Sequence, residues 1–141
     1  VNLERTNFRY LTKETVTEEI DFASIDVSFI SLKKILPVLF DFLKNNGQTV
    51  ALIKPQFEAG KDKVGKKGVV REPETHKEVL DNFVALTKML DFKILGLTYS
   101  PVKGPEGNIE FLAHLTLADV NGIEPDTGLL VQQAHQSLNG M

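Results

Sequence analysis

The stretch Thr49-Val50-Ala51-Leu52-Ile53-Lys54-Pro55 decides the fold, because it reads as a short apolar strand that ends in a lysine and a proline. Continuous apolar runs of this length are typical of strands buried on both faces of a sheet. A lysine is rarely placed at the end of such a strand without a partner, and the proline sets the chain direction there. We therefore expect a buried sheet with a functional group at one edge.

On both sides of this stretch, helix and strand patterns alternate along the chain. A helix is predicted from Leu32 to Asn46, ending at Asn45-Asn46-Gly47, and a second one from Glu72 to Leu90 with Pro73 in its first turn. Further strands are predicted at Phe22–Phe29, Phe92–Tyr99 and Ile109–Leu117. This alternation predicts an α/β fold with a mostly parallel sheet and an antiparallel final pair.

The composition excludes several classes of protein. The chain has 141 residues, of which 42% are hydrophobic and 25% are charged, as is ordinary for one globular domain. No apolar run approaches the roughly 20 residues that span a bilayer, and the first ten residues lack the apolar block of a secretory signal. Cysteine is absent and no histidines are paired at ligand spacing, so we expect no metal site. These features favour a cytoplasmic protein.

Three charged residues are expected to meet at one edge of the sheet. Asp26 and Lys54 lie at the ends of two predicted strands, and Glu110 begins the last one. Functional groups gather at strand ends in open α/β sheets, where two acids and an amine can move a proton or orient a hydroxyl. The alternatives are that Asp26 caps a helix, that Lys54 reaches out to water, and that Glu106 in the turn replaces Glu110. We prefer Glu110 because the strand fixes its direction.

A basic, glycine-rich loop follows the strand that ends at Lys54. The net charge of −3 gives the chain no overall attraction to nucleic acid, so an RNA-binding surface would have to be a local patch. A charge run is often only a solvated surface. The position of the loop nevertheless favours contact with phosphates, and we expect Gly60 to Arg71 to be mobile without RNA. Its basic residues are Lys61, Lys63, Lys66, Lys67 and Arg71.

Five ordered blocks of the sequence resemble the TlyA family of FtsJ-like rRNA methyltransferases, whose members are often called hemolysin-like. Such proteins look like an N-terminal S4 RNA-binding domain followed by a Rossmann-like methyltransferase domain. They transfer a methyl group from S-adenosylmethionine to a ribose 2′-hydroxyl of rRNA. The blocks are Leu3-Glu4-Arg5-Thr6-Asn7-x-Arg9, Ile25-Asp26-Val27-Ser28-Phe29-Ile30-Ser31-Leu32, Lys54-Pro55-Gln56-Phe57-Glu58-Ala59-Gly60, Gly68-Val69-Val70-Arg71 and Lys103-Gly104-Pro105-Glu106-Gly107-Asn108-x-Glu110-Phe111-Leu112.

The resemblance implies roles for individual residues. In the Lys-Asp-Lys-Glu catalytic set of FtsJ-like enzymes, Asp26 matches the Asp, Lys54 the second Lys and Glu110 the Glu. Asn7 and Asp26 are expected to border S-adenosylmethionine, and rRNA or ribosomal subunits are the expected partners. The first Lys, the glycine-rich cofactor loop and the N-terminal strands have no counterpart in this chain. Residues 1–117 are therefore expected to be the C-terminal portion of the methyltransferase domain, and residues 118–141 a divergent tail with one polar helix from Leu129 to Leu138.

The leading hypothesis for function is 2′-O-methylation of rRNA by a full-length enzyme that contains this chain. A cytolysin, as the family is often described, and a non-catalytic RNA-binding module are the alternatives. In a Rossmann-like methyltransferase the strand ending at Asp26 lies beside the first strand, which is missing here. The isolated chain is therefore expected to expose an unpaired strand edge, to self-associate or be only marginally stable, and to bind S-adenosylmethionine negligibly.

Overall fold

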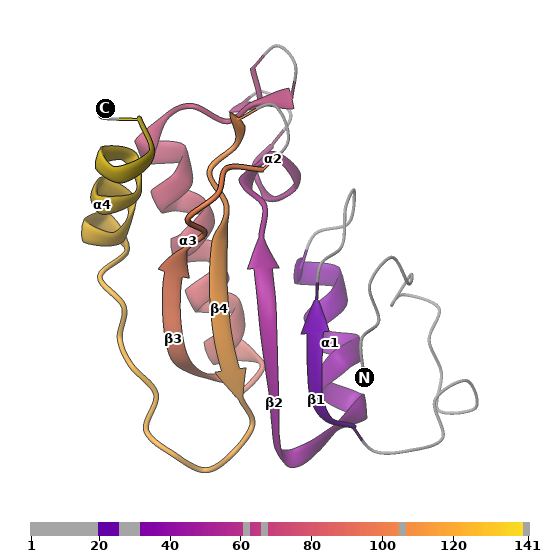
Figure 1. Ribbon diagram of the computed structural model, residues 1–141. Coiled ribbons are helices and arrows are strands. Elements are labelled where there is room, and N and C mark those ends of the chain that lie inside the picture. The colour runs from indigo at the N-terminus through magenta and orange to yellow at the C-terminus, as the bar shows by residue number, and fades with distance from the viewer. Residues whose placement is uncertain (1–19, 26–31, 61–62, 66–67, 105–106, 140–141) are drawn as a thin grey trace.

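The computed structural model describes residues 20–25, 32–60, 63–65, 68–104 and 107–139. Within these ranges the chain folds into strands and helices that alternate for most of its length (Figure 1). The elements are β1 (Ile20–Ile25), α1 (Leu32–Phe42), β2 (Leu43–Ile53), α2 (Pro55–Glu58), α3 (Pro73–Met89), β3 (Lys93–Tyr99), β4 (Phe111–Thr116) and α4 (Thr127–Asn139).

The strands form one mixed sheet in the order β1-β2-β4-β3. β1 and β2 are parallel, whereas β4 is antiparallel to both of its neighbours, β2 and β3. Three strands therefore run in one direction and the last strand of the sequence runs against them. The predicted α/β class, with a mostly parallel sheet and an antiparallel last strand, is confirmed.

One face of the sheet carries the hydrophobic core. Ala51 and Ile53 on β2 are fully buried, while Val50 and Leu52, which point to the other face, are only half-buried. In Figure 1, α1 and α3 pass behind the sheet and no described helix crosses its front. The prediction that 49–53 is buried on both faces is therefore wrong for the described residues. The helices add Ile35, Leu36, Leu80, Phe83, Val131 and Ala134 to the core.

Helix α1 ends earlier than its sequence pattern predicts. We expected it to continue to Asn46, but it stops at Phe42, and Leu43 already begins β2 opposite Ile20 of β1. The carbonyl oxygen of Gly47 accepts hydrogen bonds from the backbone N–H of Leu117 (3.0 Å) and from the hydroxyl of Thr116 (3.0 Å). Hydrogen bonds to distant parts of the chain therefore hold this segment extended and override the local signal for a helix end.

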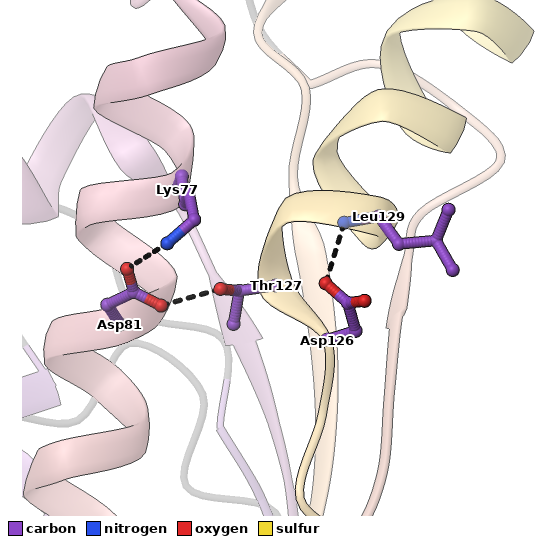
Figure 2. A network of polar contacts seen from close by, with 5 residues as sticks. All are labelled: Lys77, Asp81, Asp126, Thr127 and Leu129. Atoms are coloured by element: carbon purple, nitrogen blue, oxygen red, sulfur yellow. Dashed lines mark hydrogen bonds and ion pairs between the residues drawn. The ribbon is translucent and has the colours of Figure 1, made fainter.

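The C-terminal helix α4 is attached to α3 by a short polar network (Figure 2). The hydroxyl of Thr127 donates to one carboxylate oxygen of Asp81 (2.6 Å), and Lys77 donates to the other (2.7 Å). Asp126 accepts from the backbone N–H of Leu129 (3.0 Å) and so caps the start of the helix. The predicted polar helix is present, but it is amphipathic because Leu130, Val131 and Ala134 are buried.

Candidate active site

Two of the three predicted catalytic residues occupy neighbouring positions at one edge of the sheet. In the antiparallel pair of β2 and β4, Ile53 lies opposite Phe111. Lys54 directly follows Ile53, and Glu110 directly precedes Phe111, so the strand pairing brings both to the carboxyl end of β2. Ligands bind at such strand ends in open α/β sheets. The catalytic roles of Lys54 and Glu110 stay predictions.

The third predicted residue, Asp26, lies outside the described residues, as does Asn7. The strand before Asp26 is nevertheless placed. β1 runs parallel to β2 and ends at Ile25, which pairs with Ala51. The carboxyl ends of β1 and β2 therefore face the same edge as Lys54, as the sequence pattern requires. Whether the Asp26 carboxylate meets Lys54 stays a prediction.

The carboxylate of Glu110 is buried and closely surrounded. Its side chain is 6% exposed, and the amide Nε2 of Gln56 donates to Oε2 at 3.0 Å. A Cβ atom added to Gly104 would lie 2.3 Å from the same oxygen, so a larger residue there would have to displace the Glu110 carboxylate. The loop between β3 and β4 and the first turn of α2 therefore fix Glu110 together.

Gln56 is a site residue that the sequence analysis missed. Besides its bond to Glu110, it has a side-chain oxygen, Oε1, that is buried and has no hydrogen-bond partner among the described residues. A buried acceptor without a partner is costly unless a ligand or water satisfies it. The sequence does hold a clue, because Pro55 favours a helical first turn directly after the strand, which directs the next side chain back over the strand end.

The basic loop is anchored where it is described. Val69 and Val70 are 4% and 2% exposed, and the buried side chain of Asn108 bonds both to Val70 N (2.9 Å) and to the Gly68 carbonyl (2.9 Å). These contacts hold Gly68–Val70 in place, so the predicted mobility of Gly60–Arg71 does not extend to these three residues. Lys63 forms an ion pair with Glu78, and Arg71 is exposed. The other predicted RNA contacts, Lys61, Lys66 and Lys67, lie outside the described residues.

Two histidines join this loop to α4. His76 Nε2 lies 3.1 Å from the Val70 carbonyl oxygen, which only accepts, so Nε2 carries the proton. His76 Nδ1 is then the acceptor for the Nε2–H of His135, at 2.7 Å. Burial, and after it the neighbouring His135, lower the pKa of His76 to about 4. Burial, and after it Lys103, lower the pKa of His135. Both rings are neutral at pH 7.

Comparison with known proteins identifies the sequence relatives of this chain. Residues 1–117 match the family model described as FtsJ-like methyltransferase. A Bacillus subtilis protein named "Putative rRNA methyltransferase YqxC" is 51% identical over 116 residues, which are 82% of this chain and 41% of that protein. The Mycobacterium tuberculosis protein "16S/23S rRNA (cytidine-2'-O)-methyltransferase TlyA" is 39% identical over 115 residues, which are 82% of this chain and 43% of that protein.

A solved structure supports the same relationship. The structure titled "Putative hemolysin from Streptococcus thermophilus" superposes with a TM-score of 0.86 at 47% identity, covering 95% of this chain and 50% of that one. The chain thus spans half or less of the length of each of these three relatives. In the described ranges, no helix is both long and apolar enough to cross a membrane. Among the same residues, no three acidic or histidine side chains gather in a way that would hold a metal ion.

Proposed function

The chain belongs to the FtsJ-like methyltransferase family, and from this premise we propose that it is part of an enzyme that methylates a ribose 2′-hydroxyl of ribosomal RNA. The name of the Mycobacterium tuberculosis relative, an rRNA (cytidine-2'-O)-methyltransferase, supports both the 2′-oxygen and the rRNA substrate. We further propose S-adenosylmethionine as the methyl donor and the cytoplasm, where ribosomal subunits are found, as the place of action.

The observation that supports this proposal is that Lys54 and a buried Glu110 flank the register pair Ile53 and Phe111 at the carboxyl end of β2. A ribose hydroxyl is a poor nucleophile at neutral pH, so the reaction benefits from a group that orients the hydroxyl and accepts its proton. Glu110 would hold the Lys54 amine or accept from the hydroxyl.

The described residues fit the hydroxyl acceptor better than the methyl donor. Lys54, Gln56 and Glu110 supply an amine, an amide and a carboxylate, which suit a sugar hydroxyl. S-adenosylmethionine supplies an activated methyl group when it is bound. The residues expected to border it, Asn7 and Asp26, lie outside the described ranges, so its contacts stay a prediction.

Methyl transfer to rRNA by the longest natural protein that carries this chain tests the proposal. We expect radiolabel from S-adenosylmethionine to enter rRNA as a 2′-O-methyl nucleotide, recognised because its 3′ linkage resists alkaline hydrolysis. Lys54→Ala and Glu110→Gln should each lower kcat by about two orders of magnitude or more, as expected for groups that handle a proton. Lys93→Ala, which removes a lysine paired with Asp91, is the matched control.

The outcomes of this assay separate the hypotheses. A non-catalytic RNA-binding module predicts rRNA binding without methyl incorporation in the wild type. Full incorporation in Lys54→Ala would refute the assigned role of Lys54 while leaving the family membership intact.

A further inference from the structure

A small cavity with cationic walls lies between the start of α3, the end of α4 and the loop before β4. Its volume is about 140 Å³, and the residues around it include Arg71, Lys103, Gly107, His76 and His135. No Asp or Glu is among the described residues that line it. Gly107 has a φ of +87° and open space where a side chain would lie, so a ligand can approach its backbone closely. The cavity suits an anion.

The two cations of this cavity differ from four other described lysines in having no ion-pair partner among the described residues. Lys63, Lys77, Lys88 and Lys93 each form an ion pair with a carboxylate. Arg71 and Lys103 form neither an ion pair nor a hydrogen bond with any described residue. Two like charges brought to one cavity without a counter-ion repel each other, and an anion between them removes that repulsion.

The histidines provide a second, titratable pair of groups on the same cavity. His135 donates its Nε2–H to His76; burial and then His135 lower the pKa of His76, and burial and then Lys103 lower the pKa of His135. A bound oxyanion would favour the protonated form of His135, because it adds an opposite charge beside the ring. The loop carrying Lys103 also carries Gly104, whose backbone contacts the Glu110 carboxylate. The cavity and the candidate active site therefore share one loop.

We propose that Arg71, Lys103 and the His76–His135 pair bind a backbone phosphate of the RNA strand whose ribose lies at Lys54 and Glu110. Arg71 supplies a planar fork that suits two phosphate oxygens, and Lys103 supplies a point charge. This inference rests on the proposed function and adds a phosphate site to it. The contact positions the substrate, so Arg71 and Lys103 are positioning residues.

Histidine NMR signals of the full-length protein test the site without methyl transfer. Inorganic phosphate should shift the ring signals of His76 and His135 saturably and raise the pKa of His135, while His114 on β4 should not respond. The double variant Arg71→Gln/Lys103→Gln should lose this response. The control Lys88→Gln/Lys93→Gln, which removes the same charge from two paired lysines, should keep it. Absence of a saturable response, or equal loss in both double variants, would overturn the site.

Binding of an rRNA fragment identifies the natural source of the phosphate. The fragment should displace inorganic phosphate from the cavity, and Arg71→Gln/Lys103→Gln should lower the slope of log affinity against log salt by about one relative to the control. In the methylation assay the double variant should raise KM with little change in kcat. Phosphate that binds but is not displaced by RNA would refute the RNA assignment. If the protein binds phosphate and RNA at this cavity but transfers no methyl group, the proposed function is refuted while the phosphate site stands.

Discussion

The carboxylate of Glu110 is fixed from two sides, by the amide of Gln56 and by the backbone at Gly104. This arrangement predicts that Gln56→Met, which keeps the length of the side chain, lowers kcat for methyl transfer. A hydrogen bond to a charged group contributes about 1.5–3 kcal/mol, which corresponds to roughly 10- to 100-fold in rate. Steady-state kinetics of the full-length enzyme would measure it, with Gln132→Met on the exposed side of α4 as the control. Unchanged kcat would show that Glu110 does not need this contact.

At the level of residues, the sequence was sufficient to predict a position that follows from one strand end. Lys54 and Glu110 were predicted to lie near each other because each lies at a strand end, and the register of β2 and β4 places them at neighbouring positions, while their catalytic roles stay predictions. Gln56 and Asn108 were not found, because their partners, Glu110 and Val70, are 54 and 38 residues away. A side-chain contact between residues far apart in the chain leaves no periodic pattern in the sequence.

Helices α3 and α4 are coupled through the His76–His135 hydrogen bond, which makes the stability of their contact depend on pH. The pKa of His76 is about 4 in the folded chain and about 6.5 when unfolded, so the unfolded chain binds more protons between these values. The contribution of His76 to the free energy of unfolding should therefore be fully present above pH 6.5. It should be lost as the pH drops towards 4, which lowers the free energy of unfolding by up to about 3 kcal/mol. His135, whose pKa is also lowered, acts in the same direction.

Thermal unfolding checks this expectation when it is measured at a series of pH values from about 4.5 to about 7.5, which covers the range in which His76 changes its protonation on unfolding. His76→Gln should flatten the dependence, because glutamine does not titrate. His114→Gln changes a histidine of β4 that is hydrogen-bonded to Gln48 of β2, and it should leave the pH dependence unchanged. Asp81 also has a lowered pKa, chiefly through its hydrogen bond to Lys77, but a carboxylate loses its contribution only at lower pH. Equal pH dependence in the wild type and His76→Gln would rule out His76 as the cause.

Elements were predicted well where one periodic pattern covers the whole element. Helix α3 begins one residue after the predicted start and ends one residue before the predicted end, because its buried stripe repeats along its full length. The predicted end of α1 was wrong because Leu43 pairs with β1 and Gly47 accepts a hydrogen bond from Leu117, directly after β4. Such pairing depends on strands elsewhere in the chain, which a local pattern does not contain.

The described sheet as a whole has β1 at its edge, with β2 as its only partner in the strand order. Phe22 on this strand is 46% exposed and belongs to the sheet face that no described helix covers. An unpaired strand edge beside exposed apolar surface is a template for association. We therefore predict that the isolated 141-residue chain self-associates as its concentration rises, as measured by size-exclusion chromatography with light scattering.

A charge placed on the edge strand provides the control. Ser24→Lys should reduce the association, because a lysine on an edge strand opposes pairing with a second chain. Gln132→Lys, which places the same charge on the exposed side of α4, should not. A chain that stays monomeric over the whole concentration range would contradict the prediction and would imply that β1 is covered.

The packing of α4 shows that the end of the family model and the end of the folding unit are different positions in this chain. The family model ends at residue 117, although the solved Streptococcus thermophilus structure covers 95% of this chain. The cooperative folding unit extends further, because Leu130, Val131 and Ala134 fill the core beside α3. The family model and the folding unit therefore end about one helix apart. A fragment cut at residue 117 would lose the part of the core that α4 supplies, so a boundary taken from a family model is not the boundary of a folding unit.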